Sequence, residues 1–533
     1  MIAVRLTPAE LRTVGGRVQF AILTTGDTGV GWPCMTSDSV VSTRTISPGT
    51  FDPVRHFYPR VLNAQIHPLV RYFMDLGNAR IIERYRHLNP EASKEAVERV
   101  LTSRVKSFRW GGADLFHTTD ESGRRRMVVI ETNSCPSGNK SMPLLVEREE
   151  QAGYGILLER SFVPSLARRS LPKGELAVLY DKNEMETSAY AATLADLTNS
   201  DVHWVPCFVD DPDPSHRFDE QGVLHIRSEG GDWVPIRAAL RYVTQRPWTR
   251  IPPITKTLIY NPTLVCLAGG RNKALAAKAY DLYNAELGRE GLAVHIPETI
   301  WDVSRDEIPL WVRRMGGVAV VKNPYSNAGQ GVWTITSEDE LEAFMDLEHR
   351  YGRFIVQALI GNVGWSSHGH EGTLYHVGTV PGKQGKIFAA DLRMMVGNGP
   401  DGFFPVAIYA RRARSPLAVS LESGQTSWEM LGTNLSVKLP DGSWTTESER
   451  LMLMDSRDFN RLGVGFDDLI EAYLQTVLAI CSIDRMAQTL VTQKGRFRRR
   501  LFRSMNPDAA LVDEIMAPMK DKPPTPSGEG QTR

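Results

Sequence analysis

A stretch of strand, glycine loop and strand between residues 318 and 335 constrains the fold of this chain more than any other segment. An apolar run ends at Lys322, a loop of small and turn-forming residues follows, and a second apolar run begins at Val332. The period of two and the β-branched residues predict a β-hairpin. Gly329 and Gly331 would let loop N–H groups approach an anion closely, and Lys322 would add a positive charge. The hairpin is therefore either a phosphate-covering flap or an ordinary glycine turn.

Composition limits the class of protein and gives no sign of a nucleic-acid partner. The chain has 533 residues, 42% of them hydrophobic and 23% charged, which predicts a soluble globular protein of several domains. Lys+Arg and Asp+Glu are balanced at 62 each. No apolar run reaches the length of a membrane span, and the N-terminus lacks a signal-peptide pattern. The five cysteines form no CxxC pair, which favours a reducing, cytoplasmic setting over disulfides or structural zinc.

A second hairpin is predicted between residues 108 and 138, and it carries a set of oxygen ligands. One strand bears Asp114, and a buried strand across a turn runs directly into Glu131 and Asn133. Residues 131 and 133 share one face because strand side chains alternate with a period of two. Two carboxylates and an amide oxygen suit Mg²⁺, with Mn²⁺ as an alternative, bound together with phosphates. The competing interpretation is a solvated acidic strand end.

The rest of the chain divides into further units by its pattern. A strand, a helix and a second strand after residue 175 indicate an α/β unit, and no GxGxxG follows the first strand, so no dinucleotide site is expected. We predict an N-terminal region 1–160 that includes the hairpin 108–138, an α/β unit 165–255, a larger α/β domain 256–490, a basic segment 491–503 and a disordered tail 504–533.

Several short motifs follow one another in a characteristic order. They are Asn272-Lys273 at the start of a helix, Pro297-Glu298-Thr299, Val320-Val321-Lys322 with its glycine loop, Gln357 to Ile360, Asp391-Leu392-Arg393, Arg411, and Thr433-Asn434. Together with the acidic hairpin, this ordered set resembles the ATP-grasp superfamily of carboxylate ligases. The resemblance implies two α+β subdomains that grip ATP, preceded by a Rossmann-like substrate domain over 165–255. It also implies an ADP-forming reaction, in which an amine displaces phosphate from an acyl phosphate.

The resemblance assigns a role to each candidate site residue. The phosphates of the nucleotide would be held by Lys273, Lys322 and the flap residues Ser326, Asn327, Ala328, Gly329, Gln330 and Gly331. The hinge Gln357, Ala358, Leu359 and Ile360 would recognise adenine with its main-chain groups. The metal ligands would be Asp114, Glu131 and Asn133, and the catalytic groups Arg393, Arg411 and Asn434. Arg241 and Ser134 would contact the substrate, although Arg241 could equally serve a structural ion pair.

The order of the motifs is itself informative. The metal hairpin comes last in most ATP-grasp enzymes, whereas here it precedes the lysines. This order is similar to the circularly permuted branch typified by eukaryotic-type glutathione synthetase and, more loosely, glutathionylspermidine synthetase. Glu131-Thr132-Asn133-Ser134 and Leu240-Arg241-Tyr242 resemble segments of the first enzyme. The flap lacks its triple glycine, and Asp391-Leu392-Arg393 looks more like the glutamate-ligase type that acts on ribosomal protein.

The alternatives concern chemistry and partners. We expect a small-molecule carboxylate and an amine as substrates, with an amino acid or peptide among them, and a homo-oligomeric assembly. The same fold could instead support a small-molecule kinase or a nucleotide-binding regulatory protein without turnover. The basic run from Lys494 to Arg503 could recruit an acidic or nucleic-acid partner, including a protein or RNA-linked acceptor, or it could be a solvated helix end.

Overall fold

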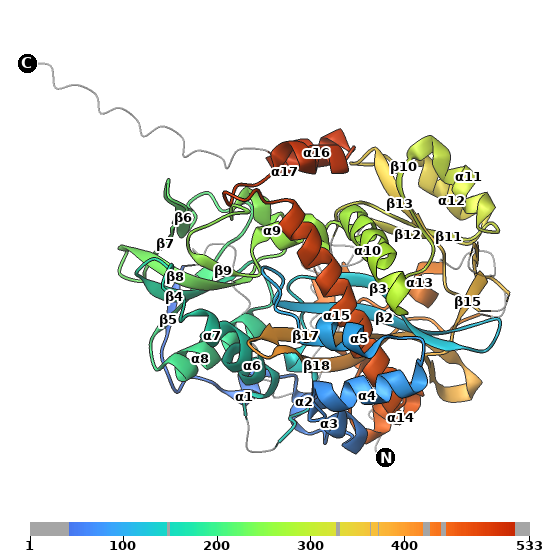
Figure 1. Ribbon diagram of the computed structural model, residues 1–533, viewed down its shortest axis with the longest axis horizontal. Coiled ribbons are helices and arrows are strands. Elements are labelled where there is room, and N and C mark those ends of the chain that lie inside the picture. The colour runs from blue at the N-terminus through green and yellow to red at the C-terminus, as the bar shows by residue number, and fades with distance from the viewer. Residues whose placement is uncertain are drawn as a thin grey trace, which may run out of the picture. The chain divides into compact units, whose positions relative to one another are not determined.

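A computed structural model describes residues 42–146, 150–326, 331–362, 364–370, 372–418, 427–438 and 444–516. Within these ranges the chain builds three large sheets and a two-stranded one, with helices between them (Figure 1). The α/β class predicted from the sequence is confirmed. Among the described residues, no helix is both long enough and apolar enough to cross a membrane.

The first sheet corresponds to the predicted α/β unit. Its strands are β1 (Arg44–Ile46), β4 (Glu175–Tyr180), β5 (Val202–Pro206), β6 (His216–Phe218), β7 (Leu224–Arg227), β8 (Trp233–Tyr242) and β9 (Leu258–Tyr260). The order is β1-β5-β4-β8-β7-β6, with β9 on β8. The central strand β4 runs parallel to β5 and β8 and is followed by α8 (Glu184–Thr198). The continuous apolar run 176–180 in β4 suits a strand buried on both faces.

The second sheet contains the predicted flap, and we call it the flap sheet. Its antiparallel strands are β10 (Thr299–Ser304), β11 (Ala319–Lys322), β12 (Val332–Ile335) and β13 (Arg353–Gln357), in the order β10-β13-β11-β12. The register places Lys322 opposite Val332, so the hairpin prediction is confirmed. Two helices, α11 (Ile308–Arg314) and α12 (Glu338–Asp346), contribute to its core. The side chain of Ser337 caps α12 by accepting from the N–H of Glu340, as its sequence predicts.

The third and largest sheet contains the acidic hairpin. Its strands are β2 (Trp110–Asp120), β3 (Arg125–Asn133), β14 (His368–Gly369), β15 (Gly372–His376), β16 (Thr379–Pro381), β17 (Ile387–Gly399), β18 (Gly402–Arg412) and β21 (Leu451–Met452). β2 pairs with β3 on one edge and with β17 on the other. The two predicted hairpins therefore lie in different sheets, and residues near 114 are hydrogen-bonded neighbours of residues near 393.

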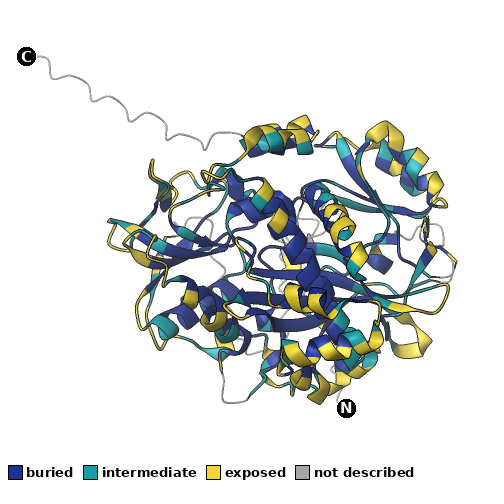
Figure 2. Cartoon of the chain, viewed as in Figure 1, coloured by how far each residue is buried: buried dark blue, intermediate teal, exposed yellow. Residues whose placement is uncertain are grey.

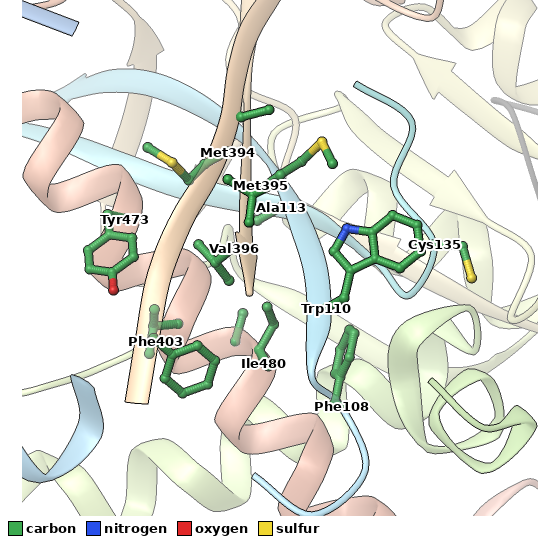
Figure 3. Packing of buried hydrophobic residues seen from close by; sticks show 14 of the residues in the cluster. Phe108, Trp110, Ala113, Cys135, Met394, Met395, Val396, Phe403, Tyr473 and Ile480 are labelled. Carbon is green, nitrogen blue, oxygen red and sulfur yellow. The ribbon is translucent and has the colours of Figure 1, made fainter. Parts of the chain in front are cut away.

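One long helix, α15 (Phe466–Thr489), packs on the third sheet and is buried along most of its length (Figure 2). Figure 3 shows Ile480 and Tyr473 of α15 among Phe108, Trp110 and Val396. The approach is close at Gly111, where a Cβ atom would lie 2.7 Å from Cδ1 of Ile480. This contact explains why a glycine occupies the second position of β2, the strand that carries Asp114.

The remaining helices cover these sheets. They are α1 (Pro53–His56), α2 (Pro59–Leu62), α3 (Pro68–Met74), α4 (Asn78–Leu88), α5 (Lys94–Leu101), α6 (Ala152–Leu157), α7 (Val163–Ser165), α9 (Thr263–Val265), α10 (Lys273–Leu287), α13 (Ser427–Leu431), α14 (Ser456–Leu462), α16 (Arg499–Met505) and α17 (Ala509–Met516). A two-stranded sheet joins β19 (Ser436–Lys438) to β20 (Trp444–Thr446).

The start of the predicted disordered tail is folded. α16 continues to Met505, and α17 follows it, so the prediction of disorder from residue 504 was wrong as far as residue 516. α17 buries Leu511, Val512 and Ile515, whose helical spacing places them on one face. Pro- and Gly-rich composition further along the tail hid this short apolar stripe. Residues 517–533 lie outside the described part of the chain.

Candidate functional site

A hollow of about 780 Å³, solvent-filled mouth included, opens between the flap sheet and the third sheet. It is lined by Asp114, Phe116, Ile130, Glu131, Lys273, Val320, Lys322, Val332, Thr334, Gln357, Ala358, Leu359, Ile360, Asp391, Arg411, Trp428, Leu431, Gly432, Thr433 and Asn434. A neighbouring hollow of about 470 Å³ shares Glu131, Lys273 and Lys322 and adds Arg271 and Thr299. This size suits a nucleotide-sized ligand.

The lysine end of the pocket consists of Glu131, Lys273 and Lys322. Nζ of Lys273, the first residue of α10, lies 3.3 Å from Oε1 of Glu131 and donates to Ser326. Nζ of Lys322, at the end of β11, donates to Oε1 of Gln357 at 2.6 Å and to a main-chain carbonyl of β3. Two strands and a helix N-terminus thus bring two cations to one partly exposed carboxylate.

Burial and charge act in opposite directions at the lysine end. Burial lowers the pKa of Lys322 to about 8, although the Glu131 carboxylate raises it. Burial raises the pKa of Glu131, but Lys273 and Lys322 outweigh it and hold this pKa below its usual value. Glu131 is therefore ionised at neutral pH, and the end carries a net positive charge that suits phosphate groups.

The arginine end of the pocket consists of Asp114, Asp391, Arg393 and Arg411. Nε and Nη2 of Arg393 donate to the two carboxylate oxygens of Asp114 at 2.5 and 2.6 Å. Arg411 lies 3.0 Å from Asp114 and forms a second two-pronged pair with Asp391. The hydroxyl of Thr433 donates to Asp391 at 2.9 Å. These four side chains form a continuous row of alternating charges.

The charge row fixes the protonation state of Asp114. Burial opposes ionisation of this carboxyl group, but Arg393 and Arg411 outweigh burial and hold its pKa well below the usual range. Arg393 also donates to the hydroxyl of Tyr409 at 3.1 Å, and that hydroxyl donates to the carbonyl of Ser137. The arginine is therefore held from two sides.

The predicted metal ligands occupy different surroundings. Asp114 and Glu131 lie opposite each other in the β2–β3 register, and Asn133 lies two residues further along the same face. Asn133 is buried, and its Nδ2 has no hydrogen-bond partner among the described residues. The described chain holds no cluster of three His, Cys, Asp or Glu residues arranged for a metal. Hard oxygen donors fit Mg²⁺ at Glu131 and Asn133, whereas both oxygens of Asp114 are already occupied.

The predicted hinge lines the pocket, but part of its main chain is already bonded. The N–H of Ala358 donates to the carbonyl of Glu298 at 2.8 Å. The N–H of Leu359 donates to the hydroxyl of Ser367 at 2.7 Å, and its carbonyl accepts from the same residue. Adenine recognition by main-chain groups stays a prediction, and these two N–H groups are engaged within the protein.

The flap residues complete the predicted nucleotide set, and Asn434 completes the predicted catalytic set. Ser326 contacts Lys273, and Asn434 lines the pocket. Gly331 closes the base of the flap with a φ of +65°, and a Cβ there would collide with the side chain of Asn323. The flap residues Asn327, Ala328, Gly329 and Gln330 lie outside the described part of the chain.

The predicted substrate residues do not line either hollow. Arg241 is fully buried and donates to the carbonyls of Asn261 and Val243 at 2.5 Å each. A third, longer bond of 3.4 Å runs from Arg241 to the hydroxyl of Ser134, which is also buried. The guanidinium therefore holds main chain inside the protein, and the substrate role of both residues stays a prediction without support from this geometry.

Sequence reasoning missed several lining residues. Phe116 lies two residues from Asp114 on β2, so the period of two could have placed it on the pocket face. Trp428 lies on α13, which Ser427 anchors to Glu340 of α12 by a hydrogen bond of 2.8 Å. Because that anchor is a tertiary contact across 87 residues, no local pattern marks Trp428. The charge row was missed for the same reason.

No family model and no curated protein matches the chain. Among solved structures it is similar to a RimK domain ATP-grasp protein from Sphaerobacter thermophilus, with 15% identity over 44% of this chain and 90% of that one, and a TM-score of 0.26. A glutathione synthetase-like effector from Globodera pallida shows 8% identity over 64% and 81%, with a TM-score of 0.34. The D-alanine–D-alanine ligase from Coxiella burnetii shows 12% identity over 60% and 97%, with a TM-score of 0.19.

The pocket brings together residues from several of the sequence motifs. One lysine ends a strand of the flap sheet, a second opens a neighbouring helix, and the acidic hairpin with its arginines faces them from another sheet. The described residues therefore form an α/β fold in which a pocket opens between two sheets, lined by both lysines and by the acidic hairpin.

Proposed function

We propose that the protein is an ATP-dependent, ADP-forming ligase that joins a carboxylate to an amine through an acyl phosphate. The observation that carries the proposal is the convergence of separate motifs on one hollow. Glu131, Lys273, Lys322 and Arg411 come from four elements that are far apart in the sequence, yet all line it. Phosphoryl transfer requires mainly positioning and charge, and the pocket offers both without a nucleophilic side chain.

The lysine end would bind the phosphates of ATP. Lys273 and Lys322 offset the negative charge that otherwise keeps a substrate carboxylate away from the terminal phosphate. Lys273 also donates to Ser326 at the base of the flap, so phosphate binding and flap position are linked. Glu131, with Asn133 beside it, would hold Mg²⁺, which when bound neutralises phosphate charge and orients the phosphates.

The arginine end would face the reacting carboxylate and the acyl phosphate. Arg411 lines the pocket, as do Thr433 and Asn434. Arg393 sits behind Asp114 and does not line the hollow, so we assign it to orienting that carboxylate. A guanidinium can stabilise the oxyanion that develops when the amine attacks. Walls from two sheets would shield the acyl phosphate from water.

The strand order supports a circular permutation. The hairpin of β2 and β3 comes before both lysines in the sequence, but β2 pairs directly with β17 in the sheet that faces them. We propose that the ATP-grasp core is assembled from residues 108–138 and 256–490, with the α/β unit between them. Connecting a hairpin to the other end of its domain leaves the sheet itself unchanged, so order in the sequence can differ from order in space.

The substrates that we propose are small molecules, an amino acid or peptide among them. The four described cysteines are buried free thiols, which supports a reducing compartment such as the cytoplasm. The basic segment exposes Lys494, Arg496 and Arg500, which leaves them accessible to an acidic or nucleic-acid partner. Recruitment of such a partner stays a prediction, as does formation of a homo-oligomer.

The test is coupled ATP turnover with Mg²⁺ and pools of amino acids and peptides, with ADP, AMP and phosphate measured separately. Release of ADP and phosphate that requires two co-substrates and is lost in Glu131→Ala would establish the ligase. A stable phosphorylated product without an amine would instead identify a kinase. AMP release would overturn the acyl-phosphate mechanism. If the protein binds ATP but turns it over neither with any of the pools nor with a macromolecular acceptor, a regulatory protein is favoured.

A further inference from the structure

The last two described helices, α16 and α17, lie against elements that hold the pocket in place (Figure 1). We call residues 498–516 the C-terminal clasp. The clasp contacts the beginning of α10, which carries Lys273, and the beginning of β13, which ends at Gln357. None of its residues lines either hollow.

The first contact is a buried pair of amides. Nδ2 of Asn272 donates to Oδ1 of Asn506 at 2.8 Å, and both side chains are buried. Oδ1 of Asn272 accepts from the N–H of Leu275 and so caps α10. The side chain that caps the helix of Lys273 is therefore oriented by a residue 234 positions later.

The same turn also holds the base of the flap. The N–H of Lys273 donates to the carbonyl of Pro324 at 2.8 Å, and Asn272 forms an isolated bridge with Tyr325. On the next turn of α10, Nζ of Lys278 donates to the carbonyl of Met505 at 2.7 Å. A shift of Asn272 would consequently move Lys273 together with Pro324 and Tyr325 at the base of the flap.

The other half of the clasp holds the flap sheet. Oδ2 of Asp508 accepts from the N–H of Arg353, the first residue of β13, at 2.8 Å. Glu514 accepts from the hydroxyl of Tyr351 at 3.1 Å and pairs with Arg350 at 2.8 Å. Asn506 and Asp508, only two residues apart, thus tie the helix of one lysine to the sheet of the other.

We propose that the C-terminal clasp positions Lys273 and the flap base for nucleotide binding, with Asn506 as the positioning residue. The inference rests on the proposed function, because the nucleotide is the ligand that the clasp prepares for. Asn506 touches no reacting atom. Its effect passes through Asn272, so nucleotide affinity should respond more strongly than turnover at saturating ATP.

The experiment measures binding of ADP with Mg²⁺ to the full chain by calorimetry, in wild type and in Asn506→Ala. Asn506→Ala removes the bond from Asn272 and also the bond of 2.7 Å that Nδ2 of Asn506 donates to the carbonyl of Phe502, four residues earlier in α16. We expect loss of the bond to Asn272 to raise the dissociation constant about five- to tenfold. The matched control is Asn89→Ala. Asn89 is the C-cap of α4 and donates to a carbonyl four residues earlier in that helix, and among the described residues it forms no hydrogen bond to α10. It should lose thermal stability but no ADP affinity.

A second variant keeps the proposal testable if Asn506→Ala does not fold. Asn272→Ser preserves a helix cap but is too short to reach Asn506, so it should weaken ADP binding by a similar factor. Unchanged ADP affinity in either folded variant overturns the inference while leaving the ligase proposal intact. Failure of the wild type to bind ADP overturns both. Equal losses of ADP affinity in Asn506→Ala and Asn89→Ala would show that the clasp contributes only to the overall stability of the protein and does not position Lys273.

Discussion

Both ends of the pocket combine basic and acidic side chains, but the charges cancel at one end and not at the other. At the arginine end, two arginines and two aspartates pair with one another, so their formal charges cancel. At the lysine end, two lysines share one carboxylate, and one positive charge remains in excess. Only the lysine end is therefore ready to accept phosphates, and the arginines can meet an oxyanion only by loosening their aspartates.

The difference has a simple cause. Asp114 and Glu131 are register partners on one hairpin, yet they face different elements. β17 and β18 bring guanidinium forks to Asp114, and a fork binds both carboxylate oxygens at once. α10 and β11 bring ammonium groups to Glu131, and a point charge leaves an oxygen free. The state of a strand carboxylate is thus decided by what the tertiary fold places opposite it.

The largest expected effect is at the lysine end. Glu131→Gln keeps the shape but removes the charge, and we expect ADP formation to fall about 10²- to 10³-fold, because a ligand for Mg²⁺ and the partner of Lys273 are lost together. The measurement is the ADP-release rate across a range of Mg²⁺ concentrations. Glu91→Gln, which removes an exposed carboxylate paired with Arg124, is the control and should leave the rate unchanged. If Glu131→Gln formed ADP at the wild-type rate, the charge of Glu131 would not be required at the lysine end.

A stability measurement tests whether the buried charge pairs at the arginine end stabilise the fold. Arg393→Met removes the two-pronged partner of a buried carboxylate, so the free energy of unfolding should fall by about 3–5 kcal/mol. Urea denaturation gives the value. Arg84→Met removes an equally two-pronged but exposed partner from Asp467 and should change stability little. Equal effects of the two substitutions would show that the charge row is not held by burial.

The pH dependence separates the two ends next. Burial lowers the pKa of Lys322 to about 8, so its positive charge is present below that pH and lost above it. We expect kcat/KM for ATP to fall as pH rises through about 8, approaching tenfold per unit. Lys322→Arg, which stays protonated, should flatten this limb, and a limb that persists in it would assign the titration elsewhere.

The same group has an opposite effect on stability. Its folded pKa lies below the ordinary value of 10.5, so the unfolded chain binds the proton more tightly between the two values. The contribution of Lys322 to the free energy of unfolding should therefore rise with pH from about 8 to 10.5. Asp114, ionised well below neutrality, contributes no change in this range.

The smallest expected effect concerns the apolar wall that serves both ends. Trp428→Ala removes an aromatic surface from the pocket, and we expect the dissociation constant for ADP to rise about fivefold without a change in Mg²⁺ dependence. Calorimetry measures both. Trp233→Ala, on β8 where Arg217 stacks on the indole, is the control. An effect of Trp428→Ala on Mg²⁺ dependence would place the tryptophan nearer to the phosphates.

Local patterns predicted the parts of this site that depend on short stretches. The period of two placed Glu131 and Asn133 on one face of their strand, and the flap hairpin around Lys322 was confirmed because its pairing is local. The α/β class followed from the same kind of pattern. These features need only neighbouring residues, so a single sequence contains the information.

The parts that escaped prediction depend on distant contacts. Arg393 meets Asp114 across 279 residues, and nothing in either segment indicates that their charges cancel. Arg241 was expected to contact substrate or to form a structural ion pair, whereas it is buried and holds main-chain carbonyls, one of them in Asn261, 20 residues away. The part of the clasp from residue 504 onward was taken for the start of a disordered tail, since its apolar stripe lies on a helix of only eight residues.

The pairing of β2 with β17 also affects how the chain is made. At about 5–20 residues per second, synthesis needs about 14–56 s to extend the chain from Asp114 to its arginine partner 279 residues later. During that interval the hairpin presents an unpaired carboxylate and an open strand edge. A nascent chain that has not reached β17 therefore offers a surface for chaperones, or for a second hairpin of the same kind.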